Sequence, residues 1–357
     1  MDSALHPAPT ARLGITISYE VDFASAVPEV VEYERAGVDL VTVAEAYSFD
    51  AVSRLGYLAA VTTTMTLASG ILPIFSRSPA LLAMTAAGLD HVSGGRFELG
   101  IGTSGAQVIE GLHGVPFEAP LGHIRENIEI FRTVWRREPL DFHGKYYDAP
   151  LTHGGKGLGK PIKIVNHLVR EDIPVSIAAL TPAAVAQTAE IANGWVPIFF
   201  WPERADAAWG DSLRKGFAKR DPALGPLDVY AANRLYVGDD TDQAMEQYRA
   251  TLALYIGGMG AKGANFYTDL ATRYGYGDEA LRIQELFLGG DKAKAAELVP
   301  EELLRSTSLI GTESQVRSRI EAMLSAGVTT ISLTALGSTP AQRLEHVEAV
   351  RAMLPRA

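Results

Sequence analysis

Short apolar runs alternate with amphipathic stretches along most of this chain. The first pair is typical: residues 13–17 form an apolar run, and residues 24–36 place Val27 and Val30 on one helical face before Gly37. A short apolar run favours a buried strand, whereas apolar positions three and four apart favour a helix. The pattern therefore predicts strands that alternate with helices.

The alternation continues to the end of the chain. The predicted strands cover residues 13–17, 39–44, 65–72, a run within 94–105, and then 175–179, 195–200, 228–237 and 329–336. Because a helical stretch follows each run, neighbouring strands are joined by crossovers and run parallel. Eight parallel strands with helices between them predict an α/β fold, a (β/α)8 TIM barrel, in a single domain of residues 1–357.

Two interruptions of this rhythm predict insertions, one after the fourth strand and one in the C-terminal third. After the fourth strand, residues 105–120 are expected to form a loop, and residues 140–147 a hairpin that turns at Gly144. In the C-terminal third, residues 257–304 are expected to be mostly helical, with a flexible break at 257–260.

Composition restricts the partners of such a barrel. The 357 residues are 47% hydrophobic and 21% charged, and the net charge of -10 comes without a dense run of lysine and arginine. This balance argues against nucleic acid or a membrane surface and favours a small-molecule substrate. There is no cysteine, and the eight histidines form no paired metal motif, so no metal site is expected. No stretch resembles a targeting signal or a membrane span, which indicates a cytoplasmic protein.

Polar residues gather where the predicted strands end. In a TIM barrel the functional site lies at the carboxyl ends of the strands, so Glu45, Gly70 and Thr103 are expected at one mouth. Glu45 could hydrogen-bond a bound ring or relay a proton, or it could be a salt-bridged residue of the rim. His113, on the connection after the fourth strand, has a pKa range suited to proton transfer, although a loop histidine is more often solvated. Glu45 and His113 are the candidate catalytic residues.

Glycines crowd the fourth strand and its end. Gly100, Gly102 and Gly105 remove side chains where a strand normally packs, which marks a close approach either by a ligand or by another backbone. The residues alone leave both interpretations open. Glu98 has the opposite strand parity from Leu99, so we expect it to point into the barrel and to need a buried partner.

Five short motifs, taken in their order and spacing, resemble one known family. They are residues 43–47, the pair Gly70-Ile71, residues 89–96, residues 100–105 and residues 189–195. Together they resemble the luciferase-like monooxygenase superfamily, and they are most similar to its branch of oxidoreductases that use the deazaflavin coenzyme F420. The resemblance spans nearly the whole chain.

This resemblance implies a homodimeric oxidoreductase that transfers a hydride between coenzyme F420 and a small organic substrate. Two alternatives stay open: an FMN-dependent monooxygenase or dehydrogenase of the same fold, and a non-catalytic flavin-binding protein. The resemblance also implies a cis peptide bond between Gly70 and Ile71, behind the ring. The implied cofactor-binding residues are Glu45, Gly70, Ile71, Gly102, Thr103, Ser104, Gly105, Ala178, Ala179, Leu180 and Thr181.

Local physics also favours residues 178–181 as the place of the cofactor phosphate. Thr181 suits the N-cap position and Pro182 the first helical position, so the next helix is expected to begin at the mouth with free N–H groups. Such a helix start attracts anions. Ala178 and Ala179 are small enough to let a phosphate reach the backbone.

Overall fold

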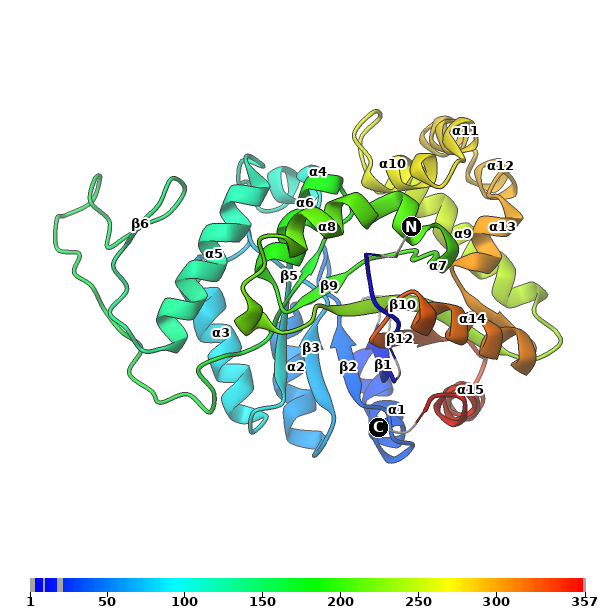
Figure 1. The fold of residues 1–357 in the computed structure, drawn as a ribbon, viewed down its shortest axis with the longest axis horizontal. Helices are drawn as coiled ribbons and strands as arrows, with labels where there is room; N and C mark the ends of the chain where they lie inside the picture. The colour runs from blue at the N-terminus through cyan, green and yellow to red at the C-terminus, as the bar shows by residue number, and fades with distance from the viewer. Residues whose placement is uncertain (1–3, 9, 18–21, 356–357) are drawn as a thin grey trace.

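The computed structural model describes residues 4–8, 10–17 and 22–355. Within them, eight parallel strands close into a barrel (Figure 1), and β12 pairs with β1 to complete the ring. In order around the barrel the strands are β1 (Arg12–Ile17), β2 (Leu40–Val43), β3 (Thr66–Ser69), β5 (Phe97–Gly102), β8 (Val175–Ala178), β9 (Gly194–Val196), β10 (Asp228–Val237) and β12 (Thr330–Ala335). The predicted TIM barrel is confirmed.

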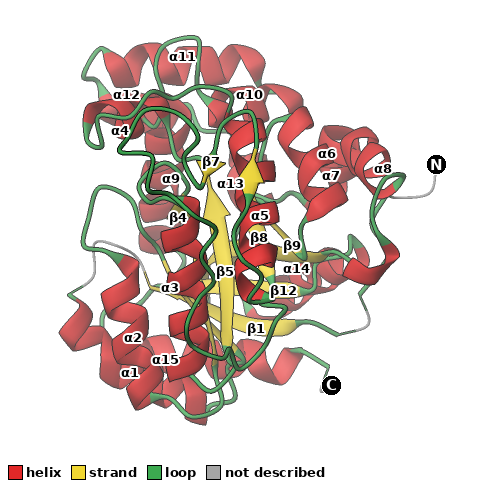
Figure 2. Ribbon diagram, turned by 90° about the vertical axis from the view of Figure 1, so that its left-hand side faces the viewer, coloured by secondary structure: helices red, strands yellow, loops and turns green. Residues whose placement is uncertain are grey.

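Helices surround the strands and connect each one to the next (Figure 2). In chain order these helices are α1 (Phe23–Arg35), α2 (Ala51–Val61), α3 (Pro79–Val92), α5 (Pro120–Trp135), α6 (Pro182–Ile191), α7 (Pro202–Ala205), α8 (Asp211–Phe217), α9 (Asp242–Gly258), α14 (Glu313–Ser325) and α15 (Pro340–Met353). A π-helical turn, Asp206–Gly210, joins α7 to α8. Strand residues that face outward, such as Leu13, Leu99 and Ile331, are fully buried against these helices and supply the apolar core.

Two short strands lie beyond the predicted set. The sequence predicts one strand over residues 65–72, but the chain forms β3 and then, after the cis Gly70–Ile71 peptide bond, β4 (Leu72–Pro73). β4 pairs with β5, and β11 (Leu309–Gly311) pairs with the end of β10. These pairings join segments far apart in the chain, which a local apolar pattern does not record.

The insertion after the fourth strand contains a helix and a hairpin. Residues 105–120, which are expected to form a loop, include α4 (Ala106–Gly111). The expected hairpin forms between β6 (Phe142–His143) and β7 (Asp148–Ala149), which pair antiparallel. The hairpin belongs to residues 138–172, here called the arm, which extends away from the barrel at the left of Figure 1.

Four helices form the insertion in the C-terminal third, at the upper right of Figure 1. They are α10 (Phe266–Arg273), α11 (Gly277–Leu288), α12 (Lys292–Glu297) and α13 (Glu301–Ser306). The predicted break is wrong at Gly257 and Gly258, because both belong to α9. A Cβ atom at either glycine would overlap Phe287 of α11, so the glycines allow α11 to lie directly against α9. No helix in the described residues combines the length and the apolar character needed to cross a bilayer.

An ion-paired cluster closes the N-terminal end of the barrel interior. The Glu98 carboxylate accepts hydrogen bonds from Arg12 Nη1 at 2.6 Å and from the Tyr230 hydroxyl at 2.7 Å. Burial, together with the negative charge of Glu98, raises the pKa of Tyr230, so its hydroxyl stays a neutral donor. Glu98 therefore points inward and finds partners on β1 and β10, as its strand parity predicts.

Candidate active site

Strand β3 ends in a bulge that lies against β5. The Gly70–Ile71 peptide bond is cis, as the resemblance implies. The Ser69 hydroxyl donates to the Gly100 carbonyl oxygen at 2.8 Å and accepts from the Gly100 N–H at 2.9 Å. A Cβ atom at Gly100 would overlap the Ser69 carbonyl oxygen, and one at Gly70 would overlap Thr42. Gly100 therefore accommodates another backbone, which settles the choice that the sequence leaves open at this position.

Gly102 lies further along β5, nearer the mouth, in an apolar wall. A Cβ atom at Gly102 would lie 3.1 Å from Ile71 Cδ1 and 3.4 Å from Ala178 Cβ. Ile71, Gly102 and Ala178 are thus neighbours that come from three adjacent strand ends, and Ile71 and Ala178 are partly exposed. A surface of methyl and methylene groups without polar side chains suits one face of a flat ring.

The segment that follows β8 is held by hydrogen bonds to its carbonyl groups. The Ala179 carbonyl oxygen accepts from the Trp195 indole at 2.9 Å. The Leu180 carbonyl oxygen accepts from the Trp209 indole at 3.0 Å and from Arg273 Nη2 at 2.9 Å. With both carbonyl groups fixed by the outer side chains, the orientation of this backbone segment at the mouth is fixed as well.

Thr181 begins α6 as predicted. Its side chain accepts the Ala184 N–H at 3.4 Å, and Pro182 occupies the first turn. Beside it lies a cation that sequence reasoning missed, Arg273 of α10, which donates only to carbonyl oxygens among the described residues. A guanidinium without a carboxylate partner, next to a helix N-terminus, makes this side of the mouth electropositive. No local motif predicts that Arg273 lies here, because it belongs to an insertion and is 93 residues from Leu180 in the sequence.

The Glu45 carboxylate is fully engaged by its neighbours. Arg77 donates to its two oxygens at 2.6 and 3.0 Å, and the Ala51 N–H donates to Oε2 at 2.7 Å. The Glu45 side chain is 8% exposed and that of Arg77 is 15% exposed. The pair links the end of β2 to the segment after β4 and stabilises the start of α2. The structure thus shows Glu45 in a salt bridge, and its catalytic role stays a prediction.

Thr103, Ser104 and Gly105 continue from β5 at the mouth, where all three are partly exposed. Ser104 has a positive φ of 60°, and Gly105 is the N-cap residue of α4. His113 lies beyond α4 and is exposed to solvent. Its imidazole makes no hydrogen bond to another described residue, so the structure does not place His113 in a network that would orient it for proton transfer.

A second histidine, His123 near the start of α5, is missed by sequence reasoning. Its ring centroid lies 5.0 Å from that of Phe75, 4.6 Å from that of Tyr146 and 5.1 Å from that of Tyr147. Phe75 follows β4, and the two tyrosines belong to the arm, so His123 joins the arm to the rim of the barrel. Burial lowers the pKa of His123, which favours the neutral imidazole. Its buried Nδ1 atom has no hydrogen-bond partner in the described residues.

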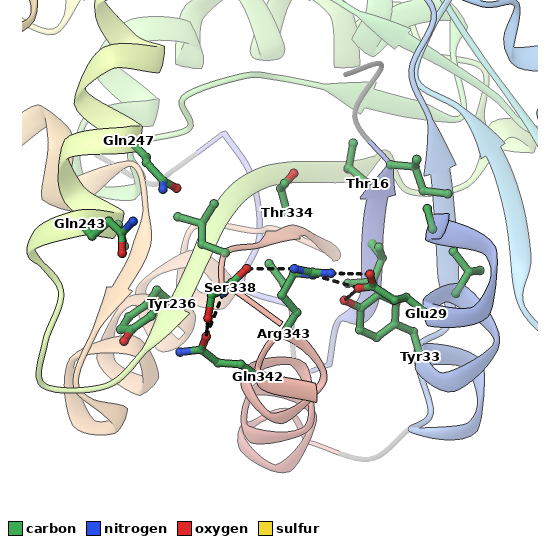
Figure 3. Close-up of a pocket in the computed structure, with 18 of the residues that line it drawn as sticks. Thr16, Glu29, Tyr33, Tyr236, Gln243, Gln247, Thr334, Ser338, Gln342 and Arg343 are labelled. Carbon is green, nitrogen blue, oxygen red and sulfur yellow. Dashed lines mark hydrogen bonds and ion pairs between the residues drawn. The ribbon is translucent and has the colours of Figure 1, made fainter. Parts of the chain in front are cut away.

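A cavity of about 490 Å³ opens at the ends of β1, β10 and β12, between α1, α9 and α15 (Figure 3). On one side Arg343 Nε donates to the Glu29 carboxylate at 2.9 Å, and the Tyr33 hydroxyl donates to it at 3.2 Å. On the other side α9 contributes Gln243 and Gln247. The described residues that line this cavity include none of the predicted cofactor-binding residues, which lie on the side of the barrel formed by β2, β3, β5 and β8.

No group of three or more histidine, aspartate or glutamate side chains is placed to hold a metal ion in the described residues. The mouth thus has an apolar wall, an electropositive helix start and an ion pair on one side. A cavity lined by both polar and apolar side chains lies on the other side.

Comparisons with known proteins identify the family of this chain. The luciferase-like monooxygenase profile matches residues 8–330. A Mycobacterium tuberculosis protein classed by name among the coenzyme F420-dependent oxidoreductases is 39% identical over 310 residues, which cover 86% of this chain and 89% of the relative. A 5,10-methylenetetrahydromethanopterin reductase of Archaeoglobus fulgidus is 27% identical, over 84% of this chain and 85% of the relative.

Among solved structures, the coenzyme F420-dependent tetrahydromethanopterin reductase of Methanopyrus kandleri has the same fold. It superposes with a TM-score of 0.78 at 24% sequence identity, and the match covers 96% of this chain and 97% of that chain. The profile match and the relatives show that the protein belongs to the luciferase-like monooxygenase family, in the branch of coenzyme F420-dependent oxidoreductases.

Proposed function

We propose that this protein is an oxidoreductase that transfers a hydride between coenzyme F420 and a small organic substrate. One observation carries the proposal: an apolar wall and an electropositive helix start lie together at the mouth. The wall is formed by Ile71, Gly102 and Ala178, and the helix start at Thr181 follows shortly after Ala178. A coenzyme with a flat ring and a phosphate in its tail needs both features.

The residues at the mouth fit this coenzyme. Ala178 and Ala179 carry only methyl groups, so a phosphate can approach the N–H groups at the start of α6, with the Arg273 guanidinium nearby. Thr103 and Ser104 are partly exposed next to the wall and offer hydroxyl groups to a polar ring edge. When bound, coenzyme F420 supplies the ring carbon that donates or accepts the hydride. The chain supplies position, electrostatics and exclusion of water.

Proton transfer accompanies hydride transfer when the substrate is an alcohol or a carbonyl compound. We keep Glu45 and His113 as the proposed proton-transfer residues. Their positions make different demands: Glu45 must exchange a hydrogen bond from Arg77 or Ala51 to meet a substrate, whereas the His113 imidazole is exposed and held by no described side chain. Measuring kcat and KM after substitution of each residue separately distinguishes the two, because loss of the proton-transfer residue should lower kcat more than it changes KM.

The test is anaerobic mixing of the protein with coenzyme F420 and a panel of neutral and anionic alcohols and carbonyl compounds, followed by the fluorescence of the oxidised coenzyme. We expect at least one substrate class to change the redox state of F420. Ala179→Asp places a carboxylate where the phosphate is proposed to bind, so this variant should fold but lose F420 affinity. Tight F420 binding without turnover of any compound supports the non-catalytic alternative, and preferential binding of FMN supports the FMN-dependent one.

We also propose that the protein is a cytoplasmic homodimer, as the resemblance implies. Apolar side chains on the arm support the dimer: Leu158 is 82% exposed, Ile162 67% and Val165 85%. A second copy that covered these side chains would remove them from water. Light scattering coupled to size-exclusion chromatography measures the mass directly, and a monomer mass for the wild-type protein would contradict the dimer.

A further inference from the structure

Arg234 points from β10 into the barrel. On the same strand, the Tyr230 hydroxyl meets Glu98 inside the barrel, whereas Asn233 contacts Met323 of α14 outside it. Because successive strand residues face opposite sides, Arg234 shares the inward direction of Tyr230. Arg234 is partly buried, so part of the residue is exposed to solvent.

Arg234 differs from the other arginines that the structure describes in having no hydrogen-bond or ion-pair partner among the described residues. Every other one donates a hydrogen bond or forms an ion pair within the chain. Some use a carboxylate, as Arg12 does with Glu98, and others use backbone carbonyl oxygens, as Arg96 does with Met65. Arg234 makes neither kind of contact with any described residue.

The surroundings of Arg234 offer hydroxyl groups and no described carboxylate within ion-pair distance. Its ladder partner on β12 is Thr334, which also lines the cavity shown in Figure 3. Burial raises the pKa of the Tyr248 hydroxyl on α9, and the positive charge of Arg234 opposes this rise. A cation in such a place lowers the free energy of unfolding unless an anion joins it.

The position of β10 adds a geometric reason for that anion to belong to the substrate. In the ring of strands, β10 lies four strands from β3 in both directions, directly across the barrel. Ile71 and the proposed coenzyme wall follow β3. A substrate that stacks on a ring at this wall therefore extends its other end toward β10 and Arg234.

We propose that Arg234 binds an anionic group, a carboxylate or a phosphate, at the end of the substrate remote from the carbon that exchanges the hydride. The planar guanidinium presents paired donors that match either anion. This assignment rests on the proposed function, because it identifies the anion as part of the substrate. It narrows the substrate from small organic molecules in general to organic acids and phosphate esters.

Calorimetric titration of the F420-loaded protein with inorganic phosphate and with acetate tests this assignment. We expect the wild type to bind at least one of the two anions, and the preferred anion identifies the substrate class. Arg234→Met should weaken that binding by about tenfold or more. Arg234→Lys should weaken it by less, because lysine keeps the positive charge but lacks the paired N–H donors of the guanidinium. Arg317→Met, which removes an exposed arginine paired with Glu313, is the matched control and should leave the affinity unchanged. Equal anion affinity of wild type and Arg234→Met, or no binding of either anion to the wild type, overturns the assignment.

Stability provides a second readout that needs no ligand. Since Arg234 contacts no carboxylate and no carbonyl oxygen in the part of the chain that the structure describes, Arg234→Met should leave the free energy of unfolding of the coenzyme-free protein unchanged or raise it. Arg12→Met, in contrast, should lower it by breaking the pair with Glu98. A loss with Arg234→Met as large as that with Arg12→Met would make Arg234 a structural residue and overturn the assignment.

If coenzyme F420 does not bind, the proposed function fails by itself. The anion titration of the coenzyme-free protein still tests Arg234, because the start of α6 is identical in all variants.

Discussion

The Ser69 carbonyl oxygen occupies the space that a Cβ atom at Gly100 would need. The Ser69 hydroxyl also bonds both the N–H and the carbonyl group of Gly100, so β3 and β5 are joined at this point by side chain and backbone together. The contact holds the end of β3 just before the Gly70–Ile71 bulge, and Ile71 then reaches Gly102 to form the wall of the mouth. The shape of the proposed coenzyme site therefore depends on Gly100, a buried glycine that lies against the backbone of Ser69.

Gly100→Ala should destabilise the fold by at least about 3 kcal/mol, because the new methyl group meets backbone, which cannot rotate away. Urea denaturation measures the change. Gly88→Ala is the matched control: Gly88 is exposed within α3, a Cβ atom there has open space, and alanine should raise stability by about 0.5–1 kcal/mol. Similar small effects at both positions would disprove the tight contact.

Glu45→Gln should lower the free energy of unfolding by about 2 kcal/mol, because it removes the charge that Arg77 meets with two hydrogen bonds. A double-mutant cycle with Arg77→Met measures the coupling between the two side chains. The exposed pair Glu313–Arg317 is the control, and Glu313→Gln should change stability by less than about 0.5 kcal/mol. A coupling energy near zero between Glu45 and Arg77 would show that the pair does not stabilise the mouth.

Thr181→Ala should remove the cap of α6, at a cost of about 1 kcal/mol, and should weaken F420 binding by about three- to tenfold. Thr312 caps α14 away from the proposed coenzyme wall, so Thr312→Ala should cost a similar amount of stability without changing F420 affinity. Comparing both variants by denaturation and by fluorescence titration separates the capping role from the binding role. Unchanged F420 affinity in Thr181→Ala would place the phosphate elsewhere.

The partly buried imidazole of His123 predicts a loss of stability in acid. Burial lowers the pKa of His123 in the folded protein below its ordinary value of 6.5, so the unfolded chain takes up the proton first. The free energy of unfolding should therefore fall as the pH drops below about 6.5. His123→Phe keeps the aromatic packing and should reduce this fall. Burial also lowers the pKa of His346, so part of the pH dependence should remain. Identical pH profiles of the variant and the wild type would contradict this assignment.

The elements of the barrel could be predicted because each strand and helix carries its own apolar periodicity. The cap at Thr181 and the inward direction of Glu98 are also local properties, one of residue type and one of strand parity. The partners are not local: Arg12 and Tyr230 reach Glu98 across 86 and 132 residues. Arg77, Arg273 and His123 were missed at the mouth for the same reason, since only the closed fold brings them to the strand ends.

The most direct test of coenzyme F420 as the cofactor is a parallel fluorescence titration of the coenzyme-free protein with F420 and with FMN. We expect F420 to bind at least about tenfold more tightly than FMN, as the branch of the family implies, and Ala179→Asp should weaken F420 binding because it places a carboxylate at the proposed phosphate site. Tighter binding of FMN than of F420, or no binding of F420 at all, would contradict the assignment.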